Sequence, residues 1–127
     1  MRVPRDVLKI LLVDDDAACL AMLGLSLRRE GFRVVTAASA ERALAILARS
    51  RYDWLVTDYR MAGMGGAELA VRAARLRPGI RTVLVSADCP AERLLECPAE
   101  RLFAKPVAVD ELAAWLRSGG AAERPAS

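Results

Sequence analysis

The chain has 127 residues, of which 54% are hydrophobic and 28% charged, a balance typical of one globular domain and not of a disordered chain. It contains no histidine, which excludes a Cys/His zinc site, a Ser/His triad and a histidine general base. The net charge is +3, and its scattered arginines are interpreted as solvated helix faces, so no direct nucleic-acid binding is expected.

Short apolar runs alternate with segments of helical periodicity, and turn or capping residues bound both. The predicted elements, in chain order, are strand Leu8–Val13, helix Asp16–Glu30, strand Arg33–Ala37, a helix from a Ser39 cap to Ser50, strand Asp53–Thr57, helix Ala67–Leu76, strand Arg81–Val85, helix Pro90–Cys97, strand Arg101–Ala104 and helix Val109–Arg117. The helix over Pro90–Cys97 is expected to be short or irregular. This alternation predicts an α/β fold, a doubly wound five-stranded parallel sheet with five helices.

The chain shows no internal repeat and no sign of a second domain. One domain is expected over residues 1–120, followed by a flexible tail over residues 121–127. No apolar stretch approaches the roughly 20 residues that a membrane helix needs. The first residues also lack the apolar region of a signal peptide, so a cytoplasmic protein without membrane contact is expected.

The first predicted helix carries no charge between Ala17 and Leu27. One face is expected to pack into the core, with Gly24 opposite it; its members are Cys19, Met22, Leu23 and Leu27. The outer face is either covered by a partner or small and bland, and both interpretations stay open. The cysteines, odd in number and without CxxC spacing, are interpreted as free thiols.

Polar side chains follow four of the predicted strands. Asp14, Asp15 and Asp16 follow the first, Asp58 the third, Ser86 the fourth and Lys105 the fifth. Because the carboxyl ends of parallel strands lie at one edge of the sheet, these groups are expected to converge there. Adjacent carboxylates repel each other, and an all-oxygen site of this kind favours Mg²⁺ or Mn²⁺. One of the aspartates, Asp16, is expected to cap the first helix instead.

These residues resemble the receiver domain of two-component response regulators across about residues 7–116. The matching pieces are LLVDDD, YDWLVTD leading into YRMAGMGG, VLVSA and FAKP, in the order and at the intervals of that family. The resemblance implies a CheY-like fold with strand order 2-1-3-4-5. It also implies a module that accepts a phosphoryl group and alters partner binding, and that is not an enzyme in its own right.

The resemblance implies a role for each site residue. Asp58 would be the phosphoacceptor. Mg²⁺ would be held by Asp15 and Asp58 directly, by Asp14 through water and by the backbone carbonyl of Arg60. After transfer, Ser86 would bond the phosphoryl group and Lys105 would pair with its oxygens. The Lys105–Pro106 bond is expected to be cis.

The implied partners are a histidine kinase or a histidine phosphotransfer protein and a downstream protein target, and a homodimer is compatible with the resemblance. Arg60 and Asp88 are expected to form an ion pair that shields the acyl phosphate from water.

The chain departs from the family pattern at several positions. Ala62 stands where proline is usual and Gly65 where Asp or Asn is usual, and the two changes are interpreted either as a looser loop or, in preference, as neutral drift. Leu102 occupies the aromatic switch position, while Phe103 is expected to face the opposite side. The stretch between Ser86 and Lys105 is shorter than usual. Coupling from the phosphoacceptor to an output surface is therefore an open question.

Two other functions are compatible with these residues. One is a degenerate receiver that acts as a phosphorylation-independent adaptor, which Leu102 and the short fourth helix favour. The other is a phosphatase of the haloacid-dehalogenase type with Asp14 as nucleophile and Asp16 as acid/base, although Ala18 departs from its motif and a later acidic pair is missing. The aspartate that carries the phosphoryl group distinguishes them.

Overall fold

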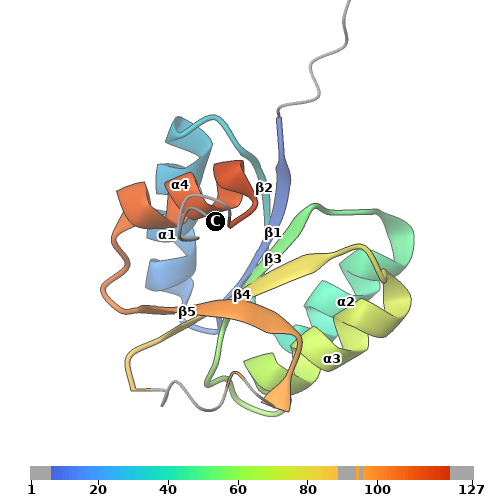
Figure 1. The fold of residues 1–127 in the computed structure, drawn as a ribbon. Coiled ribbons are helices and arrows are strands. Elements are labelled where there is room, and N and C mark those ends of the chain that lie inside the picture. The colour runs from blue at the N-terminus through green and yellow to red at the C-terminus, as the bar shows by residue number, and fades with distance from the viewer. Residues whose placement is uncertain (1–6, 89–93, 95, 121–127) are drawn as a thin grey trace, which may run out of the picture.

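The computed structural model describes residues 7–88, 94 and 96–120. The elements are β1 (Lys9–Val13), α1 (Ala17–Arg29), β2 (Arg33–Ala37), α2 (Ala40–Arg49), β3 (Trp54–Asp58), α3 (Gly66–Leu76), β4 (Arg81–Ser86), β5 (Ala99–Ala104) and α4 (Val109–Ser118). The strands form one parallel sheet in the order β2-β1-β3-β4-β5, which confirms the predicted fold class and strand order (Figure 1). Most of the helix predicted over Pro90–Cys97, and all of the predicted tail, lie outside the described residues.

Helices cover both faces of the sheet, α1 and α4 on one side and α2 and α3 on the other (Figure 1). Successive side chains of a strand point to opposite faces, so β1 contributes to two cores. Ile10 and Leu12 pack with the α1/α4 side, whereas Leu11 and Val13 pack with the α2/α3 side. Burial on both faces explains why this strand is an unbroken apolar run. Among the described residues, no helix has both the length and the apolar character needed to cross a bilayer.

The core-facing side of α1 differs in part from the prediction. Cys19 is exposed and Met22 is 71% exposed, so neither packs in the core. Leu27 is buried as expected, but so is Gly24, which was expected on the opposite face. A Cβ at Gly24 would lie 3.3 Å from Thr36 Cγ2, which shows how closely the helix approaches β2. One physical reason is that α1 has no charge before its last turn to orient the helix. In addition, the small residue Gly24 permits a close contact between the helix and β2.

Local signals set the element ends as expected. The Asp16 side chain accepts hydrogen bonds from the backbone N–H groups of Ala18 and Cys19, and Ser39 accepts one from Arg42. These two caps fix the starts of α1 and α2.

The two neighbouring residues Leu102 and Phe103 of β5 have different surroundings. Phe103 is buried at 4% exposure in the α1/α4 core. Leu102 is only partly buried and belongs to neither core, which agrees with strand alternation.

Candidate functional site

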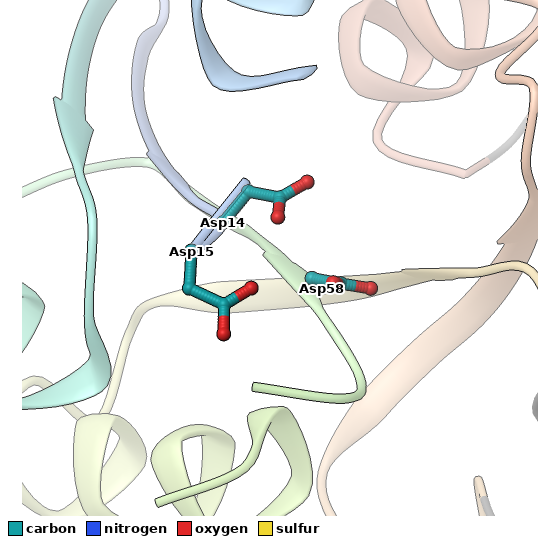
Figure 2. A group of neighbouring side chains, drawn as sticks. All are labelled: Asp14, Asp15 and Asp58. Carbon is teal, nitrogen blue, oxygen red and sulfur yellow. The ribbon is translucent and has the colours of Figure 1, made fainter. Parts of the chain in front are cut away.

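The strand ends bring the predicted site residues together. Asp58 and Ser86 are the last residues of β3 and β4, Asp14 and Asp15 follow β1, and Lys105 follows β5. One oxygen from each of Asp14, Asp15 and Asp58 lies within 4.8 Å of the other two, and their carboxylates gather beside the ends of β1 and β3 (Figure 2). Three converging carboxylates are the donor set that a hard divalent cation prefers, so these residues fit Mg²⁺.

Lys105 reaches into the same cluster. Its Nζ lies 2.9 Å from Asp14 Oδ2 and 3.5 Å from Asp58 Oδ2. The backbone N–H of Lys105 donates to the carbonyl of Ser86, and the Lys105–Pro106 peptide is cis, as expected. The ammonium group therefore lies between two carboxylates at the end of the sheet, where it can also reach an anionic group carried by Asp58.

Burial and neighbouring charges shift the pKa values of Asp58 and Lys105. Burial raises the pKa of Asp58, the Asp14 charge raises it further, and Lys105 opposes both effects. Burial alone would lower the pKa of Lys105, but its contacts with Asp14 and Asp58 raise it overall. The lysine thus keeps its charge at neutral pH, while an ionised Asp58 is stabilised by any further positive charge placed beside it.

The other aspartates are held by backbone N–H groups. Asp14 Oδ1 accepts from the backbone N–H of Asp16 at 2.9 Å, and Asp15 Oδ2 accepts from the backbone N–H of Ala62, also at 2.9 Å. Charged acceptors strengthen such bonds. The loop after β3 is consequently attached to the segment after β1.

Comparison with known proteins decides the family. The chain matches the family described as the response regulator receiver domain over residues 10–117. The chain belongs to this family. A receiver domain (CheY-like) from Methanospirillum hungatei superimposes with a TM-score of 0.83 at 30% identity, covering 89% of this chain and 93% of that one.

Two curated relatives differ in how much of their own length this chain spans. The chain is 40% identical over 78 residues to transcriptional regulatory protein GlrR of Escherichia coli, covering 61% of this chain but only 18% of that protein. It is 31% identical over 107 residues to sporulation initiation phosphotransferase F of Bacillus subtilis, covering 82% of this chain and 86% of that protein. The chain thus spans a small part of one relative and most of the other.

The expected ion pair between Arg60 and Asp88 is present beside the receiver site, which we define as Asp14, Asp15, Asp58, Ser86 and Lys105. Arg60 Nε lies 2.9 Å from Asp88 Oδ1, which joins the loop after β3 to the loop after β4. The backbone N–H of Asp88 also donates to Ser86 Oγ at 3.3 Å. The pair therefore bridges two loops that follow Asp58 and Ser86. Ligation by the Arg60 carbonyl stays a prediction.

A groove beside the receiver site was not predicted. This cavity of about 480 Å³ lies between α1 and the segment after β5, and Asp14 and Lys105 form part of its wall. Most of its lining is apolar and comes from side chains that include Met22 and Val107. The sequence feature that could have indicated this groove is the absence of charge in α1 as far as Leu27. Met22 and Cys19, which were assigned to the core, line this groove instead.

Proposed function

We propose that this receiver domain accepts a phosphoryl group on Asp58 in a Mg²⁺-dependent reaction and thereby alters its affinity for a protein partner. The observation that carries the proposal is the convergence of Asp14, Asp15 and Asp58 around one point, with Lys105 in contact with two of them. The test is whether a small phosphodonor labels Asp58.

In the proposed reaction, an Asp58 carboxylate oxygen forms a bond to phosphorus as the bond from phosphorus to the donor's histidine nitrogen breaks, and the donor histidine leaves. Mg²⁺, held by Asp15, Asp58, the Arg60 carbonyl and, through water, Asp14, would neutralise charge on the transferred group. Lys105 pairs with a phosphoryl oxygen and the Ser86 hydroxyl donates to another. The chain's own contribution is positioning and charge neutralisation.

The proposed donor is a histidine kinase or a histidine phosphotransfer protein, and the output is a downstream protein target, with a homodimer as one form that the output can take. The domain is proposed to work in the cytoplasm without binding nucleic acid. It turns over no separate substrate, so we do not propose an enzyme. A phosphorylation-independent adaptor is the second candidate, because Leu102 lies outside both cores at the position of the family's aromatic switch.

The Arg60–Asp88 pair is expected to lengthen the lifetime of the acyl phosphate by limiting the approach of water. Exposed ion pairs contribute about 0.2–1 kcal/mol, so Arg60→Ala should speed phosphate loss by up to about fivefold. The rate is measured on purified phosphoprotein after the phosphodonor has been removed. Arg49→Ala, an exposed arginine near the end of α2, is the matched control. An unchanged rate in Arg60→Ala would refute the shielding role.

The groove is proposed to receive a helix of the protein phosphodonor. Asp14 and Lys105 line it, so a helix bound there would bring its phosphohistidine beside Asp58. Met22→Glu places a charge in the apolar lining, and the rate of phosphotransfer from the protein donor should fall about tenfold. Labelling by acetyl phosphate should not change. Leu76→Glu, at another exposed apolar position, is the control; equal losses in both variants would argue against the groove.

A further inference from the structure

We infer that the backbone N–H of Ala62 is a positioning group for the metal ligand Asp15, so that metal occupancy and the conformation of the loop over residues 59–65 are linked. The inference rests on the proposed metal site. It adds a backbone group to the proposed site, which otherwise consists of side chains and the Arg60 carbonyl. It also gives a role to position 62, where the chain departs from its family.

The hydrogen bond is the main restraint described for the Asp15 carboxylate. Ala62 N lies 2.9 Å from Asp15 Oδ2, and none of the ion pairs among the described residues involves Asp15. Asp14, by contrast, contacts both Lys105 and the Asp16 backbone. Asp15 is also exposed, so its side chain would sample several rotamers without this bond.

The loop is fixed firmly enough to aim this donor. The Tyr59 N–H donates to the Val85 carbonyl, and the Gly66 N–H donates to the Tyr59 carbonyl, each at 2.9 Å. These bonds secure the two ends of the loop, and the ion pair from Arg60 to the loop after β4 adds a third attachment. Ala62 lies between these anchors, and its N–H is directed to the segment after β1.

The residue type at position 62 decides whether the donor exists. Proline has no backbone N–H, so the proline usual in the family could not make this bond. Judged from the conformational freedom of the residue type alone, alanine in place of proline predicts a looser loop. In the structure, however, alanine adds an attachment of the loop to Asp15, which proline could not provide because it lacks the N–H.

The bond should favour cation binding. A carboxylate has two oxygens with several lone pairs, so Asp15 can accept the N–H and still ligate a metal. An oriented ligand loses less rotamer freedom when the ion binds, and the N–H partly offsets repulsion from Asp14 and Asp58. Linkage is reciprocal: if the attached loop strengthens Mg²⁺ binding, bound Mg²⁺ stabilises the attached loop.

The first test measures Mg²⁺ affinity by titration calorimetry on the whole chain. Ala62→Pro removes the donor, and its dissociation constant for Mg²⁺ should rise about three- to tenfold, which corresponds to the net contribution of one ordinary hydrogen bond. Ala62→Ser keeps the N–H and should stay within about twofold of wild type. Equal or tighter binding by Ala62→Pro would overturn the inference.

The second test needs no substitution. Hydrogen exchange of the Ala62 amide, followed by NMR, should slow when Mg²⁺ is added, because the ion fixes the acceptor. Unchanged or faster exchange in protein saturated with Mg²⁺ would overturn the inference even if Ala62→Pro failed to fold. A wild-type protein that binds no Mg²⁺ would overturn both the metal site and this inference, whereas Mg²⁺ binding without these effects would overturn the inference alone.

Strain introduced by proline is separated by a double-mutant cycle without Mg²⁺. Proline also restricts the residue before it, here Met61, whatever the state of Asp15. If Ala62→Pro acts by removing the hydrogen bond, it should lower the thermal midpoint more in the wild-type background than in the Asp15→Ala background. If it acts by strain, it should lower the midpoint equally in both backgrounds. Equal losses would overturn the role of the N–H.

Discussion

Incubation with acetyl phosphate and Mg²⁺ is expected to add one phosphoryl group to the wild-type protein and none to Asp58→Asn. The substitution keeps the size of the side chain but removes the anionic nucleophile, so the loss should be complete within detection. Intact mass spectrometry measures the adduct, and its lability in mild base identifies an acyl phosphate. Ser50→Ala changes the residue that follows α2, away from the site, and is a control that should label normally.

Asp14→Asn separates the receiver mechanism from the phosphatase alternative. Asp14 is buried and pairs with Lys105, and in the receiver mechanism it assists the metal only through water. Labelling of Asp14→Asn should therefore slow but still occur on Asp58. An adduct that persists in Asp58→Asn and disappears in Asp14→Asn would make Asp14 the nucleophile. Mg²⁺ binding without any adduct, from acetyl phosphate or from a kinase, would favour the adaptor.

Gly66→Ala is expected to be the most destabilising small substitution near the site. A Cβ at Gly66 would overlap the backbone oxygen of Asp58 and lie 3.0 Å from Tyr59 Cα. Both contacts are with backbone atoms, so relief requires a shift of the chain around Asp58 and Tyr59. Overpacking of this kind costs about 1–3 kcal/mol, which lowers the thermal midpoint by roughly 3–10 °C.

The matched control for this prediction is Gly79→Ala. A Cβ at Gly79 would meet nothing within 4 Å, and its φ lies outside the left-handed region. Alanine there restricts the unfolded chain and should be neutral or stabilising by up to about 1 kcal/mol. Thermal unfolding followed by circular dichroism compares the two variants. Similar midpoints for Gly66→Ala and Gly79→Ala would contradict the close approach of Gly66 to Asp58.

Much of the fold and of the site could be predicted because both depend on the same feature, the burial of parallel strands. Strands buried on both faces, such as β1 and β3, appear in sequence as apolar runs, and the next polar residue marks the carboxyl edge of the sheet. That edge is one place in space, so Asp14, Asp58 and Lys105 could be grouped before any coordinates were known. The strand ends agree within one or two residues for the same reason.

The remaining features had no comparable signal. Cys19 and Met22 were assigned to the core face of α1 because that stretch of helix has no polar side to orient it, and the close contact at Gly24 depends on the shape of β2. The bond from Ala62 to Asp15 is made by a backbone donor, which every residue except proline carries. Such a contact depends on the path of the loop and not on a side chain.

The site draws its side chains from four different strand ends, and Asp14 and Lys105 are 91 positions apart in the chain. Contacts of this separation can form only when the long intervening chain closes, which costs conformational entropy. A fragment that begins after β1 lacks Asp14 and Asp15, and a fragment that stops before the end of β5 lacks Lys105. A ligand bound at this edge consequently stabilises the complete fold and not a local segment. A partly folded chain consequently lacks the complete set of charges at this edge of the sheet.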